Sequence, residues 1–420
     1  MRPIVKRRRK ISDPAMADDL IGNLPMHLIS CILDRIPIID AAKTSILSKT
    51  WRNIWRSRSD VNLGRPFMNQ LVSGKDRDEW DYIYSRAVKR ILLAHEGPIV
   101  KFVMHKPPLT FFKPYYGSWM SMMASKGVKH ISMISETKFP LDDMPSQFFS
   151  CSELVYLLLV RYSLNAPPNF QGFCNLTSVY LISVTFLADM SFGPQLTALS
   201  LIFCWGIQHL VCQFTRHNKN LNKFELVRSE KQEVFWAIMY DKDYSLTSTK
   251  ERINLQRFLC STPEIATLIL DSFCLTAYIY ASASVQFLDP EQGMLIRLKT
   301  DMENMKKLVL HNVDFYDLRQ ISSMLCLVRS SPNLQSLKIS VGNKGKRLKP
   351  VELAAEQYYT SLDCKKMVLH QHYTVEIGEA ENSKAEILFR DYIRASSPSL
   401  KRLYWHSKVL KEFDYKYFSF

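Results

Sequence analysis

The side chains best suited to chemistry in this 420-residue sequence do not form a recognised catalytic motif. Gly345-Lys346 resembles the end of a phosphate-binding loop, but Arg347 follows where serine or threonine is required, and Ser340 replaces the earlier glycine. The sequence contains no GxSxG nucleophile elbow and no HExxH metal-binding motif. We therefore expect a protein that is not an enzyme and that carries no cofactor.

Two pairs of side chains could in principle bind a metal ion or exchange electrons. His370 and His372 would share one face of a strand, but two ligands are too few for zinc, so we expect a surface or interface role. Cys204 and Cys212 are expected to lie in a hydrophobic core rather than to form a metal or redox pair. The sequence therefore predicts no catalytic and no metal-binding residue.

Two pairs of carboxylates, Asp142-Asp143 and Glu379/Glu381, have the composition of an acid–base pair. Nothing in the sequence places either pair in a cleft, so we expect solvated loop charges. Across the whole chain, 55 Lys and Arg outnumber 40 Asp and Glu, which gives a net charge of +15. This excess permits nucleic acid, an anionic membrane or an acidic protein as partner, but selects none of them.

The composition predicts a folded protein without a membrane anchor. Hydrophobic residues make up 47% and charged residues 23%, which is typical of chains that fold around buried cores. No stretch approaches the ~18 apolar residues of a membrane span, and no apolar core of a secretory signal follows the N-terminus. The nine cysteines include no CxxC pair and indicate reduced thiols. We expect no membrane partner and a location in the nucleus and/or cytoplasm.

A basic run opens the chain: Lys6, Arg7, Arg8, Arg9 and Lys10. The run suits a nuclear-import signal or a nucleic-acid-binding arm, and a solvated tail explains it equally well.

Residues 24 to about 55 predict three short helices. Leu28, Ile29, Ile32, Leu33 and Ile36 recur at the spacing of one helix face after Pro25, and Pro37 ends that helix. Asp40 is expected to cap a second helix and Ser48 a third, in which Trp51, Ile54 and Trp55 share one face. So short a segment cannot bury this much apolar surface alone, so we expect it to keep a hydrophobic face for a partner protein.

A repeated pattern, Leu-x-x-Leu-x-Leu, follows from about residue 128. It begins as Leu154/Leu157/Leu159, Leu176/Val179/Leu181, Leu196/Leu199/Leu201 and Leu221/Phe224/Leu226, and returns as Ile265/Leu268/Leu270, Met305/Leu308/Leu310, Leu334/Leu337/Ile339 and Leu400/Leu403/Trp405. A phrase ending in Asn-Leu or Ser-Leu precedes several triplets, as in Ser330-Ser331-Pro332-Asn333-Leu334. Spacings of 20 to 29 residues are typical of leucine-rich repeats, in which each triplet is a short strand with inward-pointing leucines.

The helical segment resembles a plant-type F-box, and the whole chain resembles the F-box/FBD/LRR-repeat family. The resemblance rests on Asp19-Leu20-Ile21-Gly22-Asn23-Leu24-Pro25, Ile36-Pro37, Ser48-Lys49 and Trp51-Arg52-Asn53-Ile54-Trp55, and more weakly on Cys364-Lys365-Lys366-Met367-Val368. It implies an α/β fold in which a short three-helix F-box precedes an irregular leucine-rich-repeat solenoid, with parallel strands and with helices or loops on the convex side. The expected divisions are a basic tail (1–17), the F-box (18–62), a linker or N-terminal cap (63–127), the repeats (128–345) and an FBD-like closing unit (350–420).

The resemblance implies a substrate-recognition subunit of a cullin-type (SCF) ubiquitin ligase, in which the F-box binds a Skp-type adaptor and the repeats bind a target protein. By position, seven residues match the adaptor-facing motif: Leu24, Pro25, Leu28, Ile29, Ile32, Leu33 and Pro37. Trp51 and Trp55 match the aromatic positions that hold the third helix. Met26 departs from the family pattern, because an acidic residue usually follows Leu-Pro. The alternatives are a stand-alone repeat scaffold for protein–protein interaction and a basic nucleic-acid-binding protein, although nucleic acid is not the expected partner.

Overall fold

The computed structural model describes residues 24–47, 51–106, 113–136, 141–207, 220–228, 258–259, 262–276, 297–342, 349–361, 373–397 and 400–406. Several sequence predictions lie outside these ranges, namely the basic run Lys6–Lys10, the Ser48-Lys49 pair, Cys212, the FBD-like motif 364–368 and the histidines His370 and His372.

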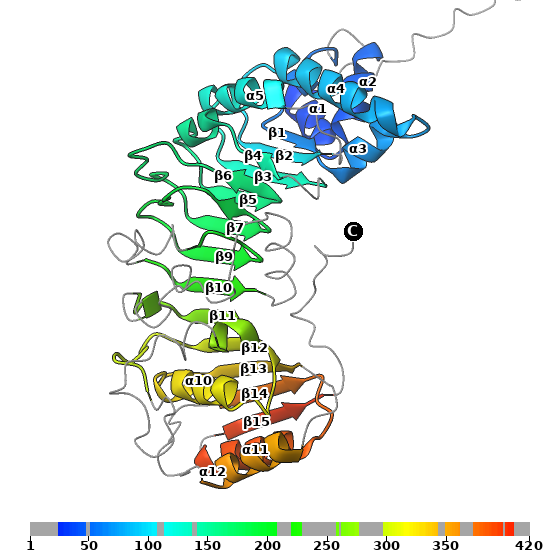
Figure 1. Ribbon diagram of the computed structural model, residues 1–420. Helices are drawn as coiled ribbons and strands as arrows, with labels where there is room; N and C mark the ends of the chain where they lie inside the picture. Colours follow the sequence, from blue (N-terminus) through cyan, green and yellow to red (C-terminus); the bar gives the residue numbers. More distant parts are fainter. Residues whose placement is uncertain are drawn as a thin grey trace, which may run out of the picture.

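A single parallel sheet of twelve strands runs through the described chain (Figure 1). Its strands follow one another in chain order: β1 (Asp60–Leu63), β2 (Lys101–Lys106), β3 (His130–Ser135), β5 (Tyr156–Val160), β7 (Ser178–Ile182), β9 (Ala198–Ile202), β10 (Lys223–Val227), β11 (Thr267–Asp271), β12 (Lys307–Val313), β13 (Ser336–Val341), β14 (Tyr373–Gly378) and β15 (Leu400–Trp405). A second sheet contains β4 (Asp142–Asp143), β6 (Tyr162–Leu164) and β8 (Thr185–Phe186). Each strand pairs only with its neighbours, as in a solenoid.

Helices cover one face of this sheet. Besides the N-terminal helices treated below, they are α3 (Arg65–Val72), α4 (Trp80–Ala94), α5 (Lys113–Ser125), α9 (Ser272–Cys274), α10 (Leu318–Arg329), α11 (Lys349–Ser361) and α12 (Lys384–Ser396), with 3-10 turns at Arg77–Glu79 and Ser146–Ser150. Buried side chains from α3, α4, α5, α10 and α12 join one hydrophobic core with the inward residues of the strands. The predicted α/β solenoid is thereby confirmed.

The leucine triplets form the inward face of the strands, as predicted. Their central residues lie in direct register, for example Leu157 beside Val179 and Val179 beside Leu199. The final triplet is only half-buried, because β15 is the last strand of the sheet and has one neighbour. The sheet also includes four strands for which the sequence pattern gave no triplet, namely β1, β2, β3 and β14. In the case of β14, position 372 carries histidine where the triplet has an apolar residue.

The Asn-Leu phrase has a structural role between successive repeats. Asn333 Nδ2 donates a hydrogen bond to the Glu303 carbonyl at 2.8 Å, and Asn304 Nδ2 donates to the Pro263 carbonyl at 3.2 Å. In the same way, Asn175 Nδ2 donates to the Ser152 carbonyl at 3.4 Å, and Asn220 Nδ2 donates to the Pro194 carbonyl at 3.4 Å. In every case the acceptor lies two residues before the triplet of the preceding repeat, so the asparagines fix the spacing of adjacent turns.

Two buried thiols make a similar contact at the other end of the strands. Cys204 Sγ lies 3.3 Å from the Leu181 carbonyl, in the preceding repeat. Cys274 Sγ lies 3.5 Å from the Leu226 carbonyl, although it is one residue farther from its triplet. Burial raises the pKa of Cys204 to about 12. This thiol therefore stays protonated and belongs to the repeat core, as expected from the sequence.

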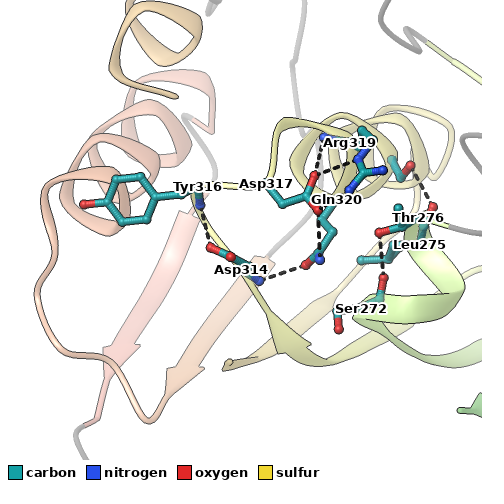
Figure 2. A network of polar contacts seen from close by, with 9 residues as sticks. Ser272, Leu275, Thr276, Asp314, Tyr316, Asp317, Arg319 and Gln320 are labelled. Carbon is teal, nitrogen blue, oxygen red and sulfur yellow. Dashed lines mark hydrogen bonds and ion pairs between the residues drawn. The ribbon is translucent and has the colours of Figure 1, made fainter. Parts of the chain in front are cut away.

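Polar side chains anchor the long helix α10 after β12 (Figure 2). Asp317 accepts a hydrogen bond from the Arg319 backbone at 3.0 Å and so caps the helix. Gln320 accepts from the Asp314 backbone at 2.8 Å, and Asp314 accepts from the Tyr316 backbone at 2.9 Å. These contacts define where β12 ends and where α10 starts to cover the sheet.

Candidate docking surfaces

The N-terminal residues 24–57, here called the helical module, contain two short α-helices. They are α1 (Met26–Leu33) and α2 (Ile38–Lys43), and each begins directly after a proline, Pro25 or Pro37. Both prolines have φ of −54°, which suits the residue before a first helical turn. Two 3-10 turns follow, at Thr44–Ile46 and Ile54–Ser57.

Two details of the predicted helices were wrong. Asp40 does not cap the second helix, because α2 already begins at Ile38. The Asp40 carboxylate instead binds Lys43 at 2.9 Å and Gln70 of α3 at 3.3 Å. The part of the third helix that is described is a turn at 51–53 and a 3-10 turn rather than an α-helix. The chain must become extended within two residues of Ser57 to enter β1, so no room remains for further α-helical turns.

The helical module has a small core of its own. It contains Ile29 and Leu33 of α1, Ala41 of α2, and Trp51 and Ile54. Trp55 packs against both this core and the core of the solenoid, while Ile38 of α2 belongs to the solenoid core. The two indoles therefore occupy central packing positions in the module.

The predicted adaptor-facing residues separate into a buried and an exposed group. Ile29 and Leu33 are completely buried, and Leu24 is half-buried. Pro25, Pro37, Leu28 and Ile32 are exposed, the last two with 42% of their surface accessible. Ile29 and Leu33 therefore support the module from inside, whereas the exposed residues remain available for contact.

Three further apolar side chains of the module are exposed: Met26, Ile46 (88% accessible) and Leu47. Together with Leu28 and Ile32 they form what we call the apolar set. The sequence pattern did not predict that Ile46 and Leu47 would lie at the surface. The sequence does contain a signal for their exposure. Ile46 and Leu47 are adjacent apolar residues that follow the end of α2, so they do not belong to the apolar face of that helix.

Arg58 connects the module to the solenoid. Its side chain is buried, and its guanidinium donates to the Ile36 carbonyl at 3.1 Å and to the Asp34 carbonyl at 3.2 Å, just beyond the end of α1. An ion pair with the Asp34 carboxylate at 3.4 Å completes the contact. Arg58 thus fixes the turn that follows α1 beside the start of β1.

His95, directly after α4, holds Arg58 from the other side. Its Nε2 lies 2.7 Å from the Arg58 carbonyl, and because a carbonyl only accepts, Nε2 carries the proton. Burial is the largest cause that lowers the pKa of His95, which keeps the ring neutral. Lys126 donates to the His95 carbonyl at 3.2 Å. We call the Arg58 and His95 contacts together the Arg58–His95 joint.

The side chains that alternate with the leucines project from the opposite face of the sheet, here called the ladder face. At its centre, Leu158, Val160 and Ile182 form a separate apolar cluster that also touches Ile134 and Ile202. Aromatic rings continue from this cluster toward the N-terminal end of the strands. Tyr156 lies 5.5 Å from Tyr180 and 5.9 Å from His130, between ring centroids. Farther along, Lys338 and Glu376 pair at 2.9 Å.

The predicted solvated state of Asp142 was wrong. Asp142 is buried on β4, where it binds Lys106 Nζ at 2.5 Å and accepts a hydrogen bond from Ser135 at 2.7 Å. The Asp142 carboxylate can be buried because the buried Lys106 ammonium group neutralises it. The sequence did not predict this pair, because the two residues are far apart along the chain. Within the described ranges, no group of three or more His, Cys, Asp or Glu residues could hold a metal ion. No described helix is long and apolar enough to cross a membrane.

Comparison with known proteins gives the class of this module. The F-box domain model matches residues 21–61. An F-box/FBD/LRR-repeat protein of Arabidopsis thaliana is 28% identical over 402 residues, which cover 91% of this chain and 90% of the relative. A putative F-box/FBD/LRR-repeat protein of the same plant is 24% identical, covering 77% of this chain and 75% of the relative. F-box/LRR-repeat protein 13 is 25% identical and spans 46% of this chain and 42% of that relative.

An F-box domain followed by a parallel leucine-rich-repeat solenoid defines an F-box/LRR-repeat protein. The predicted resemblance to the plant-type F-box/FBD/LRR-repeat family is confirmed by the F-box match and by these two long alignments. None of these matches indicates an enzymatic family.

Proposed function

We propose that this protein is the substrate-recognition subunit of a cullin-type ubiquitin ligase. Its F-box would bind a Skp-type adaptor through the apolar set and the adjoining prolines, and its ladder face would bind the protein to be ubiquitinated. We also propose that the F-box spans residues 18–62, the repeats 128–345 and the FBD-like unit 350–420, and that the protein is located in the nucleus and/or cytoplasm. Other subunits would supply the chemistry, so this chain would act as a receptor without a catalytic residue.

The exposed apolar set is the observation that supports this proposal most strongly. The helical module buries five hydrophobic side chains in its own core and leaves another five at its surface. Burial of a leucine or isoleucine side chain contributes roughly 1.5–3 kcal/mol. Because Leu28 and Ile32 are 42% accessible, covering them would contribute about 1 kcal/mol each. A partner that covers all five side chains of the apolar set would therefore gain binding free energy from each of them.

The ladder face suits the second part of the role. Its apolar cluster and its tyrosines lie on strands rather than on loops, so their positions are fixed by the sheet. A rigid receptor that holds a target near a conjugating enzyme raises the effective concentration of the target's lysines. This mechanism requires a fixed distance between the two binding surfaces, and the Arg58–His95 joint supplies a fixed connection.

Co-purification of the full chain with a Skp-type adaptor tests the proposal. A Leu28→Asp, Ile32→Asp double variant should lose adaptor binding by at least about tenfold, because it places two charges in an apolar interface. Leu187→Asp is the matched control, since Leu187 is also exposed but lies on the connection after β8. Adaptor binding that is absent from the wild type, or that survives the double variant unchanged, would contradict the proposal.

A further inference from the structure

We propose that the outer surface of α4 binds an acidic protein segment that carries apolar side chains. The surface consists of Tyr82, Arg86, Lys89, Arg90 and Leu93 of α4 together with Tyr115 of α5, and we call it the α4 face. Figure 1 shows α4 and α5 outside the first strands of the sheet. This inference goes beyond the proposed function and does not depend on it.

The spacing of these residues places them on one side of the helix. Positions 82, 86, 89 and 93 follow the three- and four-residue steps of a helix face, while Tyr84, Val88 and Leu92 point into the solenoid core. The exposed positions extend over about 16 Å, from the rise of 1.5 Å per residue. The α4 face is therefore a narrow strip, of a length that suits a single helix or a short extended segment.

Large apolar side chains lie at both ends of the strip. Tyr82 is 65% accessible and Leu93 is 66% accessible, and Tyr115 is also exposed. Single exposed hydrophobic residues are common, but here three lie along one strip formed by two neighbouring helices. Burying them against a partner would contribute favourable free energy that the isolated chain does not gain.

The charge between these apolar residues is entirely positive. In the described part of the chain, Arg86, Lys89 and Arg90 form no ion pair with a carboxylate, and Asp81, the one acidic residue of α4, is buried. The nearest exposed acid after the helix, Glu96, already pairs with Arg56 at 3.4 Å. Three uncompensated cations therefore favour a partner with negative charge.

Aromatic rings hold two of the cations in place. The Arg86 guanidinium lies 5.9 Å from the Tyr82 ring centroid and 3.3 Å from its hydroxyl oxygen. Lys89 Nζ lies 5.8 Å from the Tyr115 ring, which stacks on Trp119 at 6.3 Å. Ordered cations lose less side-chain entropy when an acidic group binds them. Leu93 favours a protein partner, because nucleic-acid bases stack on tyrosines, whereas an amphipathic acidic helix can also cover an aliphatic side chain.

Fluorescence anisotropy with the full chain tests this inference. The probe is a labelled peptide of about 18 residues, roughly five helical turns, with glutamates and leucines on the same face. A peptide with the same composition in scrambled order and a single-stranded RNA of similar length are the comparison probes. The ordered acidic peptide should bind most tightly, with affinity that falls as salt rises.

The variant Lys89→Glu, Arg90→Glu should weaken peptide binding by at least about tenfold. Its matched control is Lys401→Glu, Arg402→Glu, which makes the same change in charge at two exposed residues of β15 and should alter affinity by less than about twofold. Thermal melts of both variants check folding. Absence of saturable peptide binding up to about 1 mM, equal losses in both variants, or tighter binding of the RNA would each overturn the inference.

Discussion

Removal of the Arg58 side chain should release the helical module from the solenoid without unfolding the repeats. The guanidinium makes two charge-assisted hydrogen bonds, at 3.1 and 3.2 Å, to carbonyls beyond the end of α1. Such bonds contribute roughly 1.5–3 kcal/mol each. The ion pair with Asp34 adds little, because that carboxylate is half exposed. We expect Arg58→Ala to destabilise the module by about 3 kcal/mol, below the range of 5–15 kcal/mol for whole domains.

Hydrogen–deuterium exchange followed by mass spectrometry measures this effect on the module alone. A loss of about 3 kcal/mol corresponds to roughly a hundredfold faster exchange in the peptides that cover α1. Peptides from β9 and β12 should exchange as in the wild type, because each strand contacts only its neighbours. His95→Gln retains an N–H donor for the Arg58 carbonyl and should preserve most of the protection, whereas His95→Phe removes that donor.

Arg56→Ala is the matched control, because Arg56 pairs with Glu96 at the surface, at 3.4 Å. An exposed pair of this kind contributes about 0–1 kcal/mol, so exchange in α1 should accelerate by no more than about fivefold. If Arg58→Ala leaves α1 as protected as the wild type, or if both variants give the same exchange, the role assigned to the Arg58–His95 joint is refuted.

Two further predictions concern the solenoid. Asn333→Ala removes the 2.8 Å hydrogen bond to the Glu303 carbonyl and should lower the free energy of unfolding by about 1 kcal/mol. Urea denaturation measures this loss, and Asn333→Asp is the comparison variant, because aspartate keeps the shape of the side chain but lacks the N–H donor. Burial, the largest cause, raises the pKa of Asp271 from 3.8 to about 6, so the folded state favours the protonated form and the wild type should lose stability as the pH rises from 4 to 6. Asp271→Asn should flatten that pH dependence, and an unchanged profile would show that Asp271 does not titrate in this range.

The regular part of the fold was predictable because its signal is periodic. Each triplet has its apolar residues at fixed spacing, and the inward face of a strand requires that spacing. The triplet pattern did not predict strand β14, because His372 occupies the position of the first apolar residue of the triplet. In the helical module, Asp40 has the right residue type for a cap, but Pro37 already starts the helix. A local pattern therefore predicts an element better than it predicts where the element begins.

Contacts between residues distant in the sequence could not be predicted in the same way. Arg58 and His95 are a cation and a titratable ring with no shared motif, and only the approach of α4 to β1 brings them together. Lys106 and Asp142 likewise meet because the last residue of β2 lies beside the first residue of β4. The exposure of Leu28 compared with Ile29 depends on which side of α1 packs on Trp51, which helical periodicity alone leaves open.

The parallel register of the sheet has a consequence for the evolution of such proteins. Leu226 lies beside Leu270 across the long connection from β10 to β11, just as Leu159 lies beside Leu181 across the short connection from β5 to β7. The length of a connection therefore leaves the pairing of its two strands unchanged. Insertions and deletions between strands can alter the surface that a new partner meets, while the frame and its distance constraints are inherited intact.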